Sequence, residues 1–371
     1  ASPPRMSHPA TDIFLHACDC RTPLGDARET WARLLDGEIA LRPEVPLWDS
    51  EERVPLALMG AMDDLATPRW LAPSAELLRG APDRPWGTAR YPVVVTSSNF
   101  GIDQMLAAHR TGEEHFQEHA TAMRAVNAIA KAQGWGPNRT IISNACVSAQ
   151  LGLLHAQRLL ENDLADEALV FSFDFLSHFV VGGFHALKIL NADFPQPYAA
   201  RESGAIGLGD GLGYAVLSRE KSPYRLAAVA THSEFHHMTG NDPSGTGFDA
   251  VIAPMREAAQ SRPVFIKGHG TGTLEAGQLE AEAAHRTFPE ARLASWKGSL
   301  GHTLGSCGIV ELAITKIAFD ENRAPGNVGA AAPYFAPNVE PGPIDLTHCA
   351  GAILLSSAFG GAHAAHLLTR D

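Results

Sequence analysis

The chain has 371 residues, of which 45% are hydrophobic and 19% are charged, and its formal net charge is -12 at pH 7. This length exceeds one average domain and predicts two halves or one large α/β unit with a substantial core. The net negative charge argues against a nucleic-acid-binding protein, because proteins that neutralise phosphates are usually basic.

Membrane and secretion signals are not apparent. No apolar run reaches the length of a membrane span, and the opening residues Ala1-Ser-Pro-Pro-Arg5 lack the apolar core of a secretion signal. The five cysteines are odd in number and scattered, at positions 18, 20, 146, 307 and 349. Such spacing suits reduced thiols rather than a disulfide framework, and a metal site at Cys18 and Cys20 lacks a second ligand pair. We therefore expect a cytoplasmic protein.

Strands and helices alternate along the first half. Apolar runs predict strands over 12–18, 91–96, 166–173 and 214–217, and helical spacing predicts helices over 26–35, 182–190 and, in two pieces, 102–133. Residues 43–90 are rich in proline and arginine and predict an irregular surface segment.

One cysteine lies where a predicted strand meets a predicted helix. Ile141 and Ile142 indicate the strand, and apolar residues recur near helical spacing from Val147 to Leu159. At this turn, Cys146 faces the unpaired amides and the positive end of the helix, which favour a thiolate and could hold an oxyanion. We therefore expect a depressed pKa and interpret Cys146 as a candidate nucleophile. The alternative is an inert cysteine packed in the core.

Glycine dominates residues 203–213. A glycine-rich loop invites a phosphate-binding interpretation, but neither GxxxxGK[ST] nor a GxGxxG that follows a strand is present. We therefore interpret these glycines as positions where backbones pack closely.

The second half repeats the first in outline. Residues 292–296 predict a strand, 297–302 a glycine-rich turn, and 303–319 a helix with Gly305 and Gly308 near its start. A strand, a turn and a small-residue helix thus occur twice, and each half ends in an apolar strand, at 213–217 and 351–355. We infer a duplicated α/β unit whose two central helices meet.

Two histidines occupy turns like that of Cys146. His269 follows the apolar run 264–267 and opens a turn of glycine and threonine, and His302 ends the second glycine-rich turn. A zinc site would need a closely spaced ligand pair, which is missing. A further strand ends at Phe359 before two glycines, where either a simple hairpin bend or a mobile lid fits.

These motifs, together and in this order, resemble the β-ketoacyl synthases, the condensing enzymes of fatty-acid and polyketide assembly, over nearly the whole chain. The matching segments are 22–25, 144–148, 182–188, 209–211, 237–239, 269–273 with Glu280, 297–302 and 359–361. The resemblance implies the thiolase fold, with duplicated βαβαβαββ halves in five layers (αβαβα). Residues 1–220 would carry the nucleophile and residues 221–371 the two histidines.

The resemblance also implies residue roles. Cys146 accepts an acyl chain as a thioester, and His269 and His302 stabilise the charge that develops when malonyl-[acyl carrier protein] loses carbon dioxide. The backbone N–H groups of Cys146 and Phe359 form an oxyanion hole, and Phe359 gates the pocket. Lys297 orients and tunes the histidines. The same supporting role falls to Glu280, Thr271 and Thr273.

By the same resemblance, no metal or organic cofactor is needed beyond the phosphopantetheine arm of the carrier protein. The partners are acyl carrier protein and, in a homodimer or heterodimer, a second synthase subunit.

Several positions depart from the family pattern. Gly277 replaces an aspartate, Ala362 and His363 replace threonine and asparagine, and Ser357-Ala358 replaces Phe-Gly. These changes favour altered loop hydrogen bonding and gating, as in a specialised synthase of a polyene or polyketide pathway rather than a housekeeping one.

Two alternatives share the fold. Thiolase and chalcone-synthase relatives usually pair the nucleophile with Cys-His or His-Asn. A catalytically silent partner, like a chain-length factor, usually lacks the nucleophile. The chain keeps its cysteine, both histidines and Lys297, which favours an active synthase.

Overall fold

The computed structural model describes residues 12–43, 51–62 and 66–370. The opening segment Ala1-Ser-Pro-Pro-Arg5 and parts of the predicted irregular segment 43–90 lie outside the described residues. Among the helices of the described part, none combines the length and apolar composition that a bilayer crossing requires.

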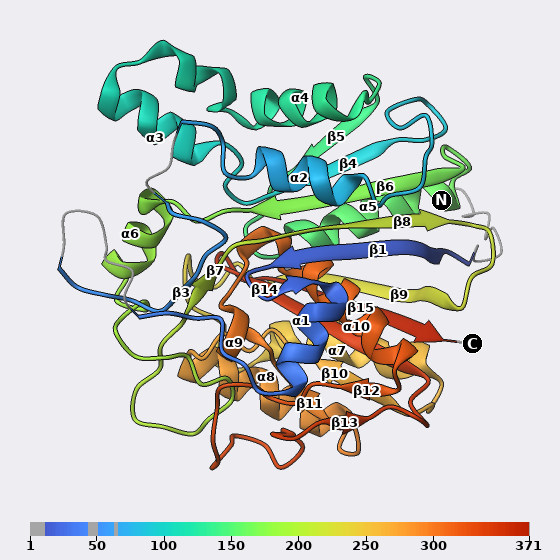
Figure 1. Cartoon of the computed structure of the whole chain (residues 1–371). Helices are drawn as coiled ribbons and strands as arrows, with labels where there is room; N and C mark the ends of the chain where they lie inside the picture. The colour runs from blue at the N-terminus through green and yellow to red at the C-terminus, as the bar shows by residue number, and fades with distance from the viewer. Residues whose placement is uncertain (1–11, 44–50, 63–65, 371) are drawn as a thin grey trace, which may run out of the picture.

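Two sets of five strands form the frame of the molecule (Figure 1). The first set consists of β1 (Phe14–Thr22), β4 (Val93–Thr96), β5 (Arg139–Ile142), β6 (Glu167–Asp174) and β8 (Gly211–Ser218). The second set consists of β9 (Tyr224–Ser233), β10 (Val264–Lys267), β11 (Leu293–Ala294), β14 (Gly351–Ala358) and β15 (Ala362–Arg370).

The two sets have the same strand order. Their spatial orders are β5-β4-β6-β8-β1 and β11-β10-β14-β15-β9, and each reads 3-2-4-5-1 when its strands are numbered along the chain. The strand pairing that joins the sets has one registered residue pair, Phe14 of β1 with Arg225 of β9. The shared order confirms the predicted duplication.

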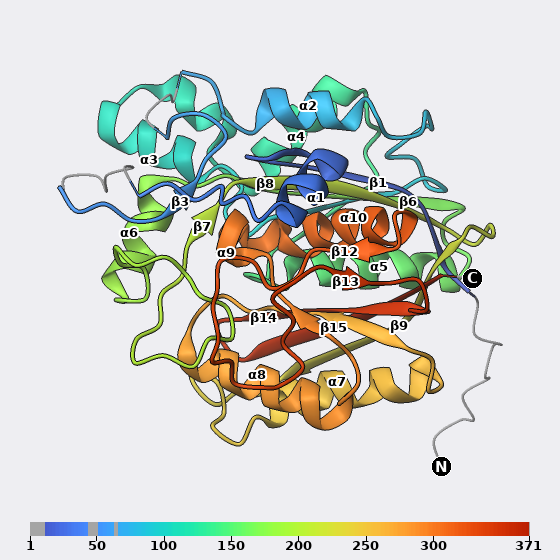
Figure 2. The ribbon, with the colours of Figure 1, turned by 60° about the horizontal axis from the view of Figure 1, so that its bottom comes forward.

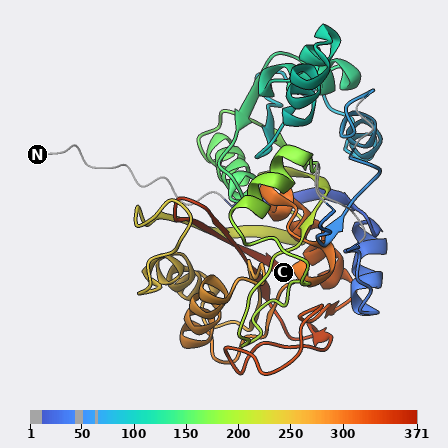
Figure 3. The same cartoon turned by 90° about the vertical axis from the view of Figure 1, so that its left-hand side faces the viewer.

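Helices separate and cover the two sets (Figure 2). Between them lie α5 (Ser148–Glu161) and α10 (Cys307–Asp320). The outer face of the first set is covered by α2 (Leu71–Leu78) and α4 (Ala122–Gln133), and that of the second by α7 (Thr246–Ala259) and α8 (Leu274–Thr287). Figure 3 views the stack from its end, with α3 (Ile102–Thr111) and α4 on one side and α7 and α8 on the opposite side. This αβαβα layering is the predicted thiolase fold.

The remaining elements are short. The helices are α1 (Ala27–Leu35), α3 (Ile102–Thr111), α6 (His178–Ala186) and α9 (Lys297–Leu300), with single 3-10 turns η1 (Glu114–His119) and η2 (Leu304–Ser306). The strands are β2 (Gly25–Asp26), β3 (Leu56–Ala57), β7 (Leu208–Gly209), β12 (Arg323–Ala324) and β13 (Ile344–Asp345).

Several predicted elements have different limits. The helix expected at 182–190 begins earlier, at His178, and the turn expected at 297–302 contains α9. The irregular segment contains α2, whose eight residues include Pro73 in the first turn, where proline is tolerated. So short a helix shows little periodicity. The sequence analysis also did not predict β9, β15, α7 and α8.

The central helix α10 is apolar on nearly all sides. Eleven of its fourteen residues are buried, because both sets of strands and α5 pack around it. A helix that is buried all round does not need an amphipathic pattern.

Gly305 marks a close approach between the two halves. A Cβ atom at this position would lie 2.7 Å from the backbone nitrogen of Ser98 and 3.1 Å from the carbonyl oxygen of Ala145. Backbone atoms cannot move aside as a flexible side chain can. Gly305→Ala should therefore lower the free energy of unfolding by about 1–3 kcal/mol, the usual cost of overpacking.

Chemical denaturation would measure this change. Gly182→Ala is the matched control, because a Cβ atom there meets nothing within 4 Å. Equal unfolding midpoints for the two variants would show that the approach at Gly305 leaves room for a methyl group.

Candidate active site

Residues from both halves line one cavity of about 220 Å³. Of the eight residues predicted for the site, six lie on its wall: Cys146, His269, Thr271, Thr273, His302 and Phe359. The other two, Lys297 and Glu280, are buried behind the wall. The structure therefore brings together side chains that the sequence separates by as many as two hundred residues.

The turn that carries Cys146 is held in a strained conformation. Cys146 lies between β5 and α5, and the preceding Ala145 has φ +43°, in the left-handed region that residues other than glycine rarely adopt. Ser148 fixes this shape, because its hydroxyl accepts a hydrogen bond from the Asn144 N–H (2.8 Å) and donates one to the Ala145 carbonyl (2.6 Å). The thiol is thus presented to the cavity at the start of α5.

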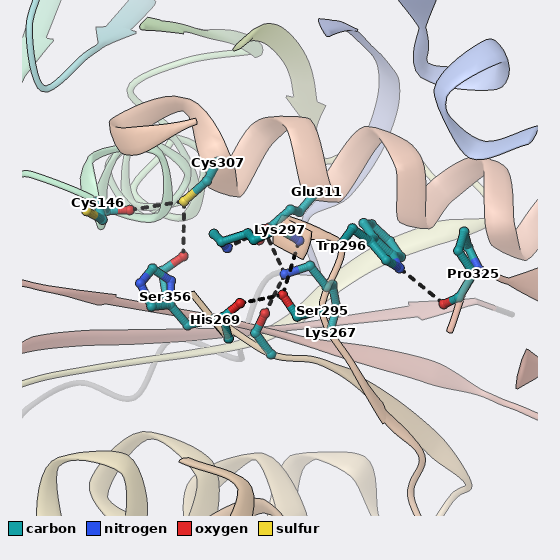
Figure 4. Close-up of polar contacts among 12 residues, drawn as sticks. Cys146, Lys267, His269, Ser295, Trp296, Lys297, Cys307, Glu311, Pro325 and Ser356 are labelled. Atoms are coloured by element: carbon teal, nitrogen blue, oxygen red, sulfur yellow. Dashed lines mark hydrogen bonds and ion pairs between the residues drawn. The ribbon is translucent and has the colours of Figure 1, made fainter. Parts of the chain in front are cut away.

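The predicted depression of the Cys146 pKa is wrong. Burial raises the pKa of the thiol well above its ordinary value, the neighbouring Cys307 raises it further, and the positive charge of Lys297 only partly opposes this. The Cys307 thiol donates a hydrogen bond to the carbonyl oxygen of Cys146 (3.4 Å; Figure 4). Desolvation therefore outweighs the helix end, and Cys146 is a protonated thiol at neutral pH.

The two imidazoles lie next to each other. The ring centroids of His269 and His302 are 5.0 Å apart, and the ring planes are nearly perpendicular. Burial and the positive charge of Lys297 hold the pKa of each well below its ordinary value. Both rings are therefore neutral near pH 7, with one N–H each.

Most of the ring nitrogens have no partner. Within the described residues, no hydrogen bond reaches Nδ1 of His269 or either ring nitrogen of His302, although all three atoms are buried. A buried polar atom without a partner costs about 1–3 kcal/mol, so such atoms in a cavity wall point to a polar ligand.

Glu280 holds the turn that carries His269. Its carboxylate, on α8, accepts hydrogen bonds from the backbone N–H groups of His269 and Gly270, and from the Tyr198 hydroxyl (3.0 Å). The carboxylate therefore contacts the backbone of the turn.

The glycine-rich segment 203–213 holds His302. The His302 N–H donates to the Gly207 carbonyl (2.7 Å), and the Gly209 N–H donates to the His302 carbonyl (3.1 Å). A Cβ atom at Gly209 would lie 2.1 Å from the carbonyl oxygen of Leu300. The prediction that these glycines allow close backbone packing is confirmed at this position.

Behind the cavity, two lysines share one carboxylate (Figure 4). Oε1 of Glu311 lies 2.6 Å from Nζ of Lys297 and 2.7 Å from Nζ of Lys267, and all three side chains are at most 5% exposed. Burial lowers the pKa of Lys267 to about 8. Burial alone would also lower the pKa of Lys297, but the Glu311 carboxylate outweighs it and raises that pKa.

The sequence analysis missed Lys267 and Glu311. Each is a charged residue within an otherwise apolar run, Lys267 at the end of β10 and Glu311 inside α10. A buried charge requires an opposite charge or hydrogen bonds, so this pattern was a signal. The pairing itself could not be predicted, because it joins distant parts of the chain.

Phe359 lies at the turn between β14 and β15. Its side chain is 40% exposed and stacks on the ring of Phe184, with centroids 5.7 Å apart. Gly360 and Gly361 follow with φ +84° and +72°, conformations that glycine adopts without strain. The ring thus stands at the edge of the cavity on a turn rich in glycine.

The duplicated sheets, with the cavity between their central turns, define the thiolase-fold class of proteins. Solved structures agree with this class. A ketosynthase from Xenorhabdus doucetiae in complex with its chain length factor matches 98% of this chain and 100% of its own, with a TM-score of 0.78 and 24% identity. A ketosynthase from a complex with a type II polyketide acyl carrier protein matches 98% and 100%, with a TM-score of 0.84 and 17% identity.

Sequence comparison places the chain within this class. Residues 225–330 match the family model of the β-ketoacyl synthase C-terminal domain. The chain is 28% identical to 3-oxoacyl-[acyl-carrier-protein] synthase 2 of Coxiella burnetii, over 61% of this chain and 59% of that protein. It is 26% identical to the ketoacyl synthase alpha subunit of the tetracenomycin polyketide synthase of Streptomyces glaucescens, over 73% and 69%. The chain is thus similar to β-ketoacyl synthases, and its residues 225–330 match the C-terminal domain of that family.

Proposed function

We propose that this protein is a β-ketoacyl-[acyl carrier protein] synthase of fatty-acid, polyene or polyketide biosynthesis. The observation that carries the proposal is the meeting of Cys146 with two neutral imidazoles, three of whose ring nitrogens are buried without a hydrogen-bond partner among the described residues. This arrangement supplies both a nucleophile and hydrogen-bond donors for an oxyanion.

The first step is transfer of an acyl chain. The Cys146 sulfur attacks the thioester carbonyl of an acyl carrier protein, the new C–S bond forms, and the carrier thiol leaves with the proton of Cys146. Because the free thiol is protonated, this proton departs during the attack. The backbone N–H groups of Cys146 and Phe359 hold the oxyanion in this step.

The second step is condensation. The N–H groups of His269 and His302 donate to the thioester oxygen of malonyl-[acyl carrier protein] and stabilise the enolate that forms when carbon dioxide leaves. The enolate carbon then attacks the acyl group on Cys146, and the thiolate is released and protonated. Lys297, Glu280, Thr271 and Thr273 position the imidazoles and the turn beside them.

This reaction draws on no metal or organic cofactor beyond the phosphopantetheine arm of the carrier. We place the protein in the cytoplasm, in keeping with five unpaired cysteines, and in a homodimer or heterodimer. The solved structures described above, of a ketosynthase with its chain length factor and of one with an acyl carrier protein, support these partner classes. A silent, chain-length-factor-like subunit is the second candidate, and the retained Cys146 disfavours it.

Mass spectrometry tests the proposal. The protein is incubated with acyl carrier protein that bears a labelled acyl chain, and peptides are mapped before and after malonyl-[acyl carrier protein] is added. We expect the acyl group on Cys146, and then its release as a β-ketoacyl product. A chain that never gains the acyl group, alone or with its partner subunit, would be a silent subunit.

Removing the charge of Lys297 should slow turnover at unchanged stability. In Lys297→Met, Glu311 keeps Lys267 as its partner, so no buried charge is orphaned and the melting temperature should change little. The imidazoles lose the positive charge that lowers their pKa, so both pKa values should rise. We expect turnover to fall by roughly tenfold or more and the acid limb of the pH–rate profile to move to higher pH.

Lys316→Met is the control, because Lys316 lies on the same helix as Glu311 but pairs with Asp320 at the surface. If Lys297→Met matched this control in rate and pH profile, Lys297 would have no role in tuning the histidines.

A further inference from the structure

A second polar network reaches the same cavity from the opposite side. Ser357 of β14 lines the cavity with Cys146, and its hydroxyl lies 2.8 Å from Nδ1 of His363 on β15. Nε2 of His363 lies 2.9 Å from Oε1 of Glu234, just after β9. A hydroxyl, an imidazole and a carboxylate thus follow one another from the cavity wall inward.

The sheet itself fixes this order. Ser357 and His363 are directly paired residues of neighbouring antiparallel strands, so their side chains leave the same face of the sheet. The Glu234 N–H donates to the Gly361 carbonyl (2.9 Å), which anchors the carboxylate beside β15. Ser357 and His363 thus stand on paired strands, and a backbone hydrogen bond ties Glu234 to the turn before β15.

The inner part of the network is sealed from solvent. The side chains of His363 and Glu234 are at most 1% exposed. A Cβ atom at Gly247 would lie 2.0 Å from Oε1 of Glu234 and 2.6 Å from Nε2 of His363, so only glycine fits over this contact. Phe248 packs against the imidazole at a centroid distance of 4.6 Å.

The position of the carboxylate favours one site for the imidazole proton. Oε2 of Glu234 accepts a hydrogen bond from the Asp242 N–H (2.8 Å), while Oε1 faces His363. A carboxylate beside Nε2 favours the tautomer with N–H at Nε2, which leaves the lone pair of Nδ1 to accept the Ser357 proton. Burial lowers the pKa of His363, so its ring is neutral near pH 7.

This geometry has the marks of an activated nucleophile: a hydroxyl within hydrogen-bond reach of a base that a third group orients. Two of its members, Ser357 and His363, fall at positions where the sequence departs from the family pattern. We propose that Ser357, His363 and Glu234 form a second nucleophilic site that hydrolyses thioesters in the Cys146 cavity. The inference rests on the proposed function in one respect, because it takes thioesters as the molecules that enter this cavity.

The chemistry balances without a cofactor. Oγ of Ser357 attacks the thioester carbonyl while its proton passes to Nδ1 of His363, and the C–S bond breaks as the leaving thiol takes that proton. Water then attacks the acyl-serine ester, giving a proton to Nδ1, and Ser357 recovers it when the C–O bond breaks. The net reaction converts a thioester and water into a carboxylic acid and a thiol.

The test removes Cys146 first, so that only the second site is read. Cys146→Ala protein is treated with a fluorophosphonate, which labels activated serines, and with an acyl thioester of N-acetylcysteamine. We expect label on Ser357 and release of the free thiol. Adding Ser357→Ala should abolish both the label and the thiol release. Adding His363→Asn, which removes the base, should slow labelling by roughly 100-fold or more. Adding Glu234→Gln should also slow labelling.

Ser356→Ala is the matched control. Ser356 is the adjacent buried serine, but it contacts Gln150 and Cys307, and its loss should leave the label in place. The inference is overturned if Ser357 stays unlabelled and no thiol is released. It is also overturned if His363→Asn and Glu234→Gln do not slow labelling. If the wild-type protein condenses but the Cys146→Ala variant does not hydrolyse the thioester, the proposed function stands and this inference is wrong. If the Cys146→Ala variant hydrolyses the thioester but the wild-type protein does not condense, this inference stands and the proposed function is wrong.

Discussion

Replacing Cys146 with alanine should abolish carbon–carbon bond formation while leaving release of carbon dioxide from malonyl-[acyl carrier protein]. In the proposed mechanism the two tasks belong to different groups, because the thiol would hold the acyl chain and the imidazoles would stabilise the enolate. The variant keeps both histidines and the lysine–glutamate cluster behind them. Labelled carbon dioxide and labelled β-ketoacyl product, measured in the same reactions, separate the two tasks.

Wild-type protein is the reference for both signals. If the Cys146→Ala variant formed the condensed product near the wild-type rate, another residue would be the nucleophile. If it released no carbon dioxide, decarboxylation would depend on the thiol, and the division of tasks would be wrong.

Removing either imidazole should have the opposite effect. His269→Ala or His302→Ala should slow decarboxylation by roughly 10²-fold or more, the scale of losing one oxyanion donor. Acylation of Cys146 should remain detectable, because its turn is fixed by Ser148 and not by the histidines. The measurement combines labelled carbon dioxide release with mass spectrometry of the intact protein.

His366→Ala is the control for the loss of a buried histidine. His366 is fully buried on β15, away from the cavity wall, and burial lowers its pKa to about 4. Its loss should leave the decarboxylation rate near that of the wild type. If the variants at 269 and 302 behaved like this control, the two imidazoles would be structural.

The sequence predicts features that local patterns encode. The turn at Cys146 appears as a short apolar run followed by helical spacing, and the glycines near His302 appear as a cluster that needs close packing. The repeat of strand, turn and helix predicts the duplication. In the first two cases the signal lies among neighbouring residues, and the repeat is a comparison of two such local signals.

The features that were missed depend on distant contacts. The pairing of Lys267 with Glu311 joins β10 to α10, and that of His363 with Glu234 joins β15 to the end of β9. The direction of the pKa shift of Cys146 was predicted wrongly for the same reason. The helix end is visible in the sequence, but the burial that outweighs it comes from the whole fold.

The cavity lies along the seam between the two copies of the repeat. Near this seam, Gly305 approaches the backbone at Ala145, and Gln150 on α5 donates a hydrogen bond to Ser356 on β14. A small sliding of one copy against the other would carry the thiol out of alignment with the imidazoles. It would also disturb the largest cluster of buried residues, which both copies share. Alignment of the site and stability of the fold are therefore coupled in this molecule.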